Sequence, residues 1–137
     1  MANIYNLFKF LEEKKGKKIP LRAKLIHAPE TLTKEDLNVE GDFYLYNKPL
    51  SSLPDNFQVE RHLFLDSTKI SSLPDNLTVG GNLSLEKTPL SSIPKNLKVG
   101  GVFFIGQTPL AKKYSEEQIR KMIEEKGGEV KGEIYTY

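Results

Sequence analysis

A twenty-residue repeat runs through the middle of this chain. The related segments SSLPDNFQVE, SSLPDNLTVG and SSIPKNLKVG begin at Ser51, Ser71 and Ser91. One unit of this length cannot bury its own apolar face, whereas stacked units bury a continuous core. The repeat therefore predicts a solenoid of about four coils over residues 31–110. Its apolar columns are Leu37, Phe57, Leu77 and Leu97; Val39, Val59, Val79 and Val99; Phe43, Leu63, Leu83 and Phe103; Leu45, Leu65, Leu85 and Ile105; and Leu50, Ile70, Leu90 and Leu110.

The apolar residues within a unit alternate with other residues. Leu77, Val79, Leu83 and Leu85 share one parity of the segment LTVGGNLSL, and this alternation is the period of a β-strand rather than of a helix. Parallel stacking pairs each strand with its equivalent in the next coil at about 4.8 Å. Twenty residues are too few for a strand and a full α-helix. We therefore expect a parallel β-solenoid whose return path is extended or a short 3₁₀ turn.

Three threonines fall in register at one corner of the predicted solenoid, namely Thr68, Thr88 and Thr108. Two interpretations of this column remain open. The hydroxyl groups form a ladder with the backbone of the neighbouring coil, or the threonines are simply exposed to solvent.

The first thirty residues do not follow the repeat. Apolar residues at helical spacing predict an amphipathic helix over residues 3–14, and Gly16 and Pro20 end it. The segment IPLRAKLIH, residues 19–27, is expected to form a strand that starts the sheet. Residues 1–30 are thus predicted to be an N-terminal helical cap.

Residues 111–137 are predicted to close the other end. Ser115 and Gln118 have the spacing of a capping box, so a helix is expected to start there. Two consecutive glycines end that helix, and the last nine residues are expected to form a final strand. Caps are expected because the open ends of a solenoid expose core side chains and unpaired strand edges. The chain is interpreted as a single α+β domain, residues 1–137.

Composition and motifs argue against catalysis. The 137 residues carry a formal net charge of +2 and no cysteine, which excludes disulfides and thiolate metal sites. His27 and His62 lack a metal-binding spacing, and Asp66 and Glu86 align across units without a partner base. We therefore expect no catalytic residue, no metal site and no cofactor. No apolar run is long enough to cross a bilayer, so a soluble cytoplasmic protein that does not bind membranes is expected.

The repeat resembles a known family. Units that read roughly as LP-x-N-L-x-V-x-G-x-L-x-L are similar to those of short bacterial and phage leucine-rich-repeat proteins. The resemblance covers residues 31–110, and it implies a leucine-rich-repeat-like curved parallel sheet that presents a binding surface. It carries over no catalytic residue. The chain departs from the pattern at Arg61, which replaces a glycine, and at Lys48, which replaces a threonine.

The opposite parity of the strands should face outward, and it carries aromatic residues that are unusual on a polar sheet face. Exposed aromatic patches with a charged rim mark interaction sites. We therefore predict that this face binds a partner protein, with Phe104 either exposed or covered by the C-terminal segment. The predicted contact residues are Tyr44, Tyr46, His62, Phe64, Asp66, Ser84, Glu86 and Phe104.

The leading hypothesis is a non-enzymatic protein–protein interaction module. Given the resemblance, one form of it is a phage-type inhibitor of a host protein, acting in the host cytoplasm as a monomer or weak homo-oligomer. The second hypothesis is a nucleic-acid-binding protein that uses a basic N-terminal cap. The third is a structural or self-associating subunit. The basic residues in question are Lys14, Lys15, Lys17, Lys18, Arg22 and Lys24.

Overall fold

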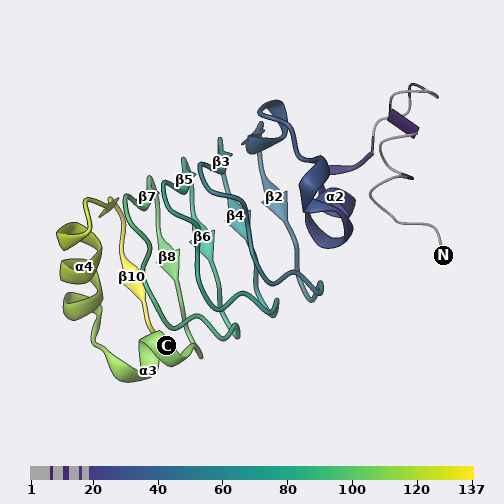
Figure 1. Ribbon diagram of the computed structural model, residues 1–137. Coiled ribbons are helices and arrows are strands. Elements are labelled where there is room, and N and C mark those ends of the chain that lie inside the picture. The colour runs from purple at the N-terminus through teal and green to yellow at the C-terminus, as the bar shows by residue number, and fades with distance from the viewer. Residues whose placement is uncertain (1–6, 8–10, 13–15, 17–18) are drawn as a thin grey trace. The chain divides into compact units, whose positions relative to one another are not determined.

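The computed structural model describes residues 7, 11–12, 16 and 19–137. These residues belong to two compact units, with the boundary between Leu37 and Asn38. The second unit is a parallel β-solenoid, in which each turn contributes one short strand to each of two parallel sheets (Figure 1). This architecture confirms the solenoid and the parallel stacking that the repeat predicts.

Both sheets contain five strands, and each strand pairs with the equivalent strand of the next turn. Val59, for example, is in register with Val39 on one side and Val79 on the other. The first sheet consists of β1 (Asn38–Val39), β3 (Gln58–Val59), β5 (Thr78–Val79), β7 (Lys98–Val99) and β9 (Glu129–Val130). The second sheet consists of β2 (Phe43–Tyr44), β4 (Leu63–Phe64), β6 (Leu83–Ser84), β8 (Phe103–Phe104) and β10 (Ile134–Tyr135).

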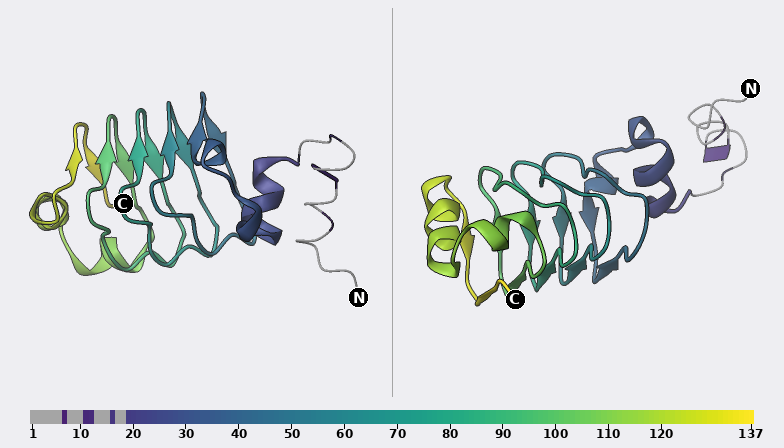
Figure 2. Two further views of the ribbon diagram at one scale, coloured as in Figure 1. Left: turned by 45° about the horizontal axis from the view of Figure 1, so that its top comes forward. Right: turned by 90° about the horizontal axis from the view of Figure 1, so that it is seen from below.

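Three turns keep the twenty-residue period, from β1 to β3, β5 and β7. The chain then departs from it after β8 and forms α3 (Pro109–Lys113) and α4 (Glu116–Glu125) before β9. The two views in Figure 2 show the stacked turns followed by these helices in green to yellow. The solenoid therefore has about three regular turns, where the sequence predicts about four coils.

The apolar columns form the core of the solenoid. Phe57, Leu77 and Leu97 are fully buried, as are Leu65, Leu85 and Ile105. Leu53, Leu73 and Ile93 of the return path are also buried and complete the wall opposite the sheets. The return path contains no helix over residues 48–57, 68–77 or 88–97, so each turn is closed by irregular chain, as its length requires.

Each turn bends between the two sheets. The sequence suggests one continuous alternation through residues 77–85, but the structure divides it into β5 and β6 at Gly80–Gly81. A Cβ at Gly80 would overlap the carbonyl oxygen of Glu60 in the preceding turn. The bend therefore brings the backbones of these two turns too close together for a side chain at Gly80.

Two further corners use left-handed backbone conformation. Asn56, Asn76 and Asn96 have φ between 55° and 65°, a region that asparagine tolerates better than most residues. Their side chains form a ladder: the Asn76 amide donates to Asn56 Oδ1 at 2.9 Å, and the Asn96 amide donates to Asn76 Oδ1 at 2.9 Å. The other corner recurs at Asn47, Ser67, Lys87 and Gln107.

The threonine column follows neither of the two interpretations. Thr68, Thr88 and Thr108 are buried, and each hydroxyl donates at 2.7 Å to a carbonyl three residues earlier in its own turn. The hydroxyl group therefore stabilises a tight corner within one turn. It makes no bond to the neighbouring turn and is not solvated.

The helix α4 begins as predicted, because the Ser115 hydroxyl and the Gln118 side chain form the reciprocal capping box. Its buried residues are Ile119 and Ile123, and it contacts β9 and β10. The Arg120 guanidinium donates to the carbonyl oxygens of Val130 and Gly132 at 2.6 and 2.7 Å. The final strand is present as two short strands, β9 and β10, one in each sheet.

The first unit differs from its prediction. Residues expected to form a strand over 19–27 instead form the helix α2 (Leu21–His27), followed by 3₁₀ turns η1 (Pro29–Thr31) and η2 (Glu35–Leu37). Pro20 occupies the N-cap of α2; proline disrupts helix interiors but is compatible with helix starts. Most of the helix predicted over residues 3–14 lies outside the described residues; Leu7, Leu11 and Glu12 are helical.

Lys24 forms two ion pairs within the first unit. The Lys24 ammonium lies 2.9 Å from Glu12 Oε2 and 3.1 Å from Asp36 Oδ2, with only 4% of its side chain exposed. Burial alone would lower the pKa of Lys24, but hydrogen bonds to the two carboxylates raise it above its ordinary value. Burial likewise acts to raise the pKa of Asp36, but hydrogen bonds from the Thr33 amide and Lys24 lower it overall.

Because the folded-state pKa of Asp36 is lowered, its carboxylate adds stability above the unfolded-state pKa of about 4. That contribution is lost as the pH falls through the lower folded-state pKa. We expect Asp36→Asn to destabilise the protein by about 1 kcal/mol at pH 7. Urea unfolding of both proteins between pH 7 and pH 2.5 should show the difference shrinking below pH 4. A difference that stayed constant down to pH 2.5 would contradict this role of the carboxylate.

Candidate interaction surface

The outward side chains of the second sheet form a surface with three columns across five strands. Inward and outward residues alternate along each strand, so Phe43 and Leu45 are buried while Tyr44 and Tyr46 are exposed. We call this surface the outward face of the second sheet. Its residues are Asp42, Tyr44 and Tyr46; His62, Phe64 and Asp66; Asn82, Ser84 and Glu86; Val102, Phe104 and Gly106; and Glu133, Tyr135 and Tyr137.

Three aromatic rings form a cluster on this face. Tyr44 lies on β2, Phe64 lies on β4, and Tyr46 follows β2 by two residues. The Tyr44 and Phe64 rings are nearly parallel, with centroids 5.1 Å apart, and Tyr46 lies 6.0 Å from Tyr44 and 6.2 Å from Phe64. The parallel register places Tyr44 directly beside Phe64. Tyr44 is 38% exposed and Tyr46 is 45% exposed. The predicted aromatic residues therefore meet in one solvent-accessible cluster, which we call the aromatic cluster.

A second group of rings lies at the other end of the face. Phe104 stacks on Tyr135 with centroids 5.3 Å apart, and Tyr135 meets Tyr137 edge-on at 5.9 Å. Phe104 is half-buried, while Tyr137 is 90% exposed. The C-terminal segment thus covers Phe104 in part and adds two tyrosines to the face. The twenty-residue repeat does not reveal them, because β10 follows β8 by thirty-one residues.

Ser84 lies between the two aromatic groups, but it offers little surface to a partner. It is 3% exposed, and its hydroxyl donates to Asp66 Oδ1. The same Asp66 oxygen accepts the Glu86 amide at 3.1 Å. Ser84 therefore holds the Asp66 carboxylate in place, and the exposed polar atoms here belong to Asp66 and Glu86, which are both half-buried.

The first column of the face forms a ladder between turns. Asp42 Oδ1 accepts the His62 amide at 3.0 Å, His62 Nδ1 accepts the Asn82 amide at 2.9 Å, and Asn82 Oδ1 accepts the Val102 amide at 2.9 Å. Each acceptor binds the backbone amide of the next turn. In this ladder the ring nitrogen Nδ1 of His62 plays the part that a carboxylate or amide oxygen plays in the turns on either side. His62 also lies 5.8 Å from Phe64, ring to ring.

We expect His62→Ala to lower the free energy of unfolding by about 1 kcal/mol, because it removes the acceptor of the Asn82 amide. His62→Asn should cost less, since asparagine already accepts the equivalent amide one turn later. Chemical unfolding at pH 7 measures both effects. Equal losses in the two variants would show that the hydrogen bond to the turn-to-turn ladder is unimportant.

The carboxylates of the face interact with its tyrosines. The hydrogen bond from the His62 amide lowers the pKa of Asp42, and the Tyr44 hydroxyl also donates to this carboxylate at 3.1 Å. Desolvation and the bond to Asp42 raise the pKa of Tyr44, while desolvation and the nearby Asp66 charge raise that of Tyr46. A hydrogen bond with Glu133 raises the pKa of Tyr135. These tyrosines are therefore neutral at physiological pH, and the Asp42 carboxylate is charged.

The basic residues of the nucleic-acid hypothesis are only partly described. Lys14, Lys15, Lys17 and Lys18 lie outside the described residues. Lys24 is buried with two carboxylate partners, so its charge is already balanced. Arg22 is exposed on α2.

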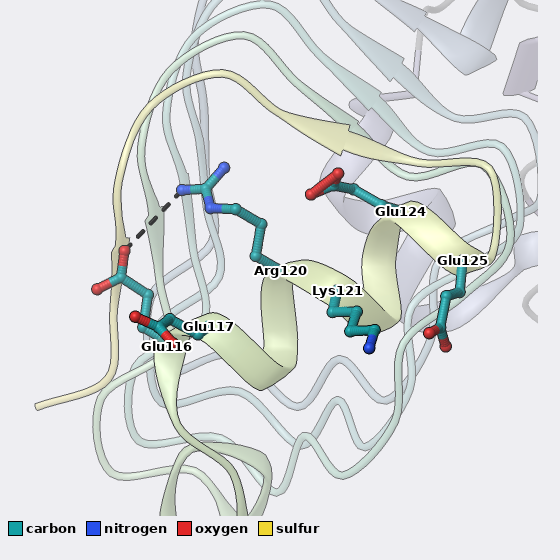
Figure 3. Close-up of a pocket in the computed structure, with 6 residues that line it drawn as sticks. All are labelled: Glu116, Glu117, Arg120, Lys121, Glu124 and Glu125. Atoms are coloured by element: carbon teal, nitrogen blue, oxygen red, sulfur yellow. Dashed lines mark ion pairs between the residues drawn. The ribbon is translucent and has the colours of Figure 1, made fainter.

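A shallow hollow of about 400 Å³ lies along α4. Its side chains include Glu117, Lys121, Glu124 and Glu125, and Arg120 forms a 4.0 Å ion pair with Glu116 (Figure 3). All the residues that line this hollow are charged, whereas hydrophobic and aromatic side chains predominate in small-molecule sites. Within residues 19–137 and the few described before them, no cluster of histidine and carboxylate side chains has metal-binding geometry.

No described helix combines the length and apolar character needed to cross a bilayer. Comparison with protein families, with curated proteins and with solved structures finds no match for the chain. The interpretation of its function therefore depends on the geometry of its own surface.

Proposed function

We propose that this chain is a non-enzymatic protein-interaction module that binds a partner protein through the outward face of the second sheet. One observation carries the proposal. Four large hydrophobic side chains are exposed among the described residues, and three of them, Tyr44, Tyr46 and Tyr137, lie on this one face. Tyrosine is enriched at binding hot spots, and exposed apolar patches with a polar rim are typical of interaction sites.

The rest of the solenoid supports the face. The backbone of each strand is fixed by its neighbours in register, so the aromatic side chains stand on a rigid surface. A rigid surface loses little conformational entropy on binding, which increases affinity. In this proposal α4 with β9 and β10 acts as the C-terminal cap, and α2 belongs to the N-terminal cap.

We also propose that the repeated units are of the leucine-rich-repeat type. On that basis, one specific form of the function is inhibition of a bacterial host protein by a small phage-encoded binder in the host cytoplasm. The parallel solenoid is compatible with this idea, but the aromatic surface supports only the more general statement of protein binding.

The test is affinity capture from a bacterial lysate with four proteins. They are the intact chain, Tyr44→Ala/Phe64→Ala, a control on the first sheet, Gln58→Ala/Lys98→Ala, and an unrelated protein. We expect one protein to be retained by the intact chain and the first-sheet control, and to bind the double aromatic variant at least about thirtyfold more weakly, because hot-spot truncations cost about 2 kcal/mol or more.

Circular dichroism and a melting curve confirm that each variant is folded. Tyr44 is exposed and Phe64 is half-buried, so each replacement should cost about 1 kcal/mol through lost ring stacking, and Phe64→Ala should cost more because buried apolar area is also lost. A partner that bound the aromatic variant as tightly as the intact chain would contradict the proposed site.

A further inference from the structure

The charge of the outward face of the second sheet differs from that of the whole chain. The chain has 20 Lys and Arg against 18 Asp and Glu. Among the fifteen residues of the face there are four carboxylates, Asp42, Asp66, Glu86 and Glu133, and no lysine or arginine. Arg61, at the bend before β4, lies 4.0 Å from Asp42 but is itself largely exposed, so it neutralises this surface only weakly.

The first sheet differs from the second in its charge and in its aromatic content. Its outward residues include Glu40, Glu60 and Glu129 as well as Lys98 and Lys131, so its charges nearly balance. Strands β1, β3, β5, β7 and β9 carry no aromatic residue at all. Aromatic rings and unbalanced negative charge therefore coincide on one side of the solenoid, which suggests a partner that satisfies both.

Two carboxylates next to the aromatic cluster are positioned for a charged ligand. Asp66 uses Oδ1 for the Ser84 hydroxyl and the Glu86 amide. Among the described residues, its Oδ2 and the Glu86 carboxylate have no hydrogen-bond or ion-pair partner. Asp66 is also close enough to Tyr46 for its charge to act on the phenol. The site thus has a carboxylate oxygen held in place beside aromatic rings.

Arginine is the side chain that matches this combination. Its planar guanidinium stacks on aromatic rings and forms two parallel hydrogen bonds with a carboxylate. Lysine offers a point charge on a strongly hydrated ammonium, and it stacks less well. Partner segments of acidic character would meet four like charges, which costs binding energy.

We propose that the partner docks on the outward face of the second sheet through an arginine-bearing segment, whose guanidinium groups pair with Asp66 and Glu86 while lying against the rings of Tyr46 and Phe64. This inference rests on the proposed function and specifies the chemistry of the partner. In this arrangement the aromatic cluster provides contact area, and the carboxylates make binding selective for arginine.

The experiment is a selection of random twelve-residue peptides displayed on a surface, with the full chain as immobilised target. Selected peptides are synthesised and their dissociation constants measured against the intact chain and three variants. The variants are Asp66→Asn/Glu86→Gln, which retains an acceptor oxygen for the Ser84 hydroxyl, Tyr44→Ala/Phe64→Ala, and the matched control Glu60→Gln/Glu129→Gln on the first sheet. Each peptide is also made with citrulline in place of arginine, which removes the charge and preserves the shape.

We expect the selected peptides to be enriched in arginine and to bind at least about tenfold more weakly to Asp66→Asn/Glu86→Gln and to Tyr44→Ala/Phe64→Ala, with the first-sheet control unchanged. Citrulline should weaken binding to a similar extent, and added salt should do the same.

Peptides that depend on Tyr44 and Phe64 but lack arginine, or that bind Asp66→Asn/Glu86→Gln equally well, would overturn the inference while leaving the proposed function intact. A selection whose peptides all ignore Tyr44→Ala/Phe64→Ala, or that yields no binding peptide, would count against both.

Discussion

Gly80→Ala is expected to lower the free energy of unfolding by about 3 kcal/mol or more, because the new methyl group would overlap the backbone of the preceding turn. A Cβ built on Gly80 would lie much closer to the carbonyl oxygen of Glu60 than van der Waals contact allows. A Cβ built on Gly100 would overlap the carbonyl oxygen of Gly80 in the same way. Because the obstructing atom is backbone, relief requires two turns to move apart, which stretches the hydrogen bond from the Gly80 amide to Val59, now 2.9 Å.

Gly41 provides the matched control at the first bend. Its φ is 72°, and a Cβ there would have nothing within 4 Å. Gly41→Asn should therefore cost less than about 1 kcal/mol, since asparagine tolerates the left-handed region and already adopts it at Asn56 and Asn76. Urea unfolding followed by circular dichroism compares the two variants. Equal midpoints for Gly80→Ala and the intact chain would mean that consecutive turns do not stack as closely as described.

Phe57→Ala is expected to have a comparable effect through the core, about 3–5 kcal/mol. Phe57 is fully buried and its ring lies 6.1 Å from that of Phe43, centroid to centroid. Truncation removes most of a large side chain from a close-packed interior, where the neighbouring turns are held in register and relax only partly.

The repeat itself supplies the control for this variant. The equivalent position of the next two turns is leucine, at Leu77 and Leu97, and both are fully buried. Phe57→Leu should therefore be tolerated, with a loss of about 1 kcal/mol. The two variants are compared by chemical unfolding at pH 7. A loss for Phe57→Leu as large as that for Phe57→Ala would show that the columns are not equivalent in packing.

The parallel solenoid could be predicted from the sequence because the apolar pattern that indicates it recurs in each unit. Each column of the repeat occurs in several turns, so a single exception such as Arg61 in the glycine column does not obscure the period. The capping box at Ser115 was equally readable, because its two hydrogen bonds are local. Both features depend on residues close in sequence or exactly one period apart, and such features are the ones that sequence patterns record.

Features outside the period were harder to predict. The segment 19–27 was expected to be a strand, yet Lys24 of this segment is buried by carboxylates from Glu12 and Asp36. Both carboxylates are twelve residues away from Lys24, so a local pattern does not contain these contacts. Even within the period, the repeat shows which residues align but not what they bind: the amides of Asn76 and Asn96 bind side chains one turn away.

The clustering of the aromatic residues follows from the sequence, but the details of the face do not. Strand parity correctly indicated that Tyr44, Tyr46 and Phe64 would face outward together. It could not show that Ser84 is covered, because the exposure of a small side chain depends on its larger neighbours. Nor could it place Tyr135 and Tyr137, because the helices between β8 and β9 interrupt the repeat.

The most direct test of the central claim, that the outward face of the second sheet binds a partner protein, is hydroxyl-radical footprinting of the chain alone and with its captured partner. Partner binding is expected to lower the oxidation rates of Tyr44 and Tyr46, while Tyr114, next to α3 and half-buried, reacts at the same rate in both states. Unchanged rates at Tyr44 and Tyr46, with protection elsewhere on the chain, would contradict the claim and locate the interaction on another surface.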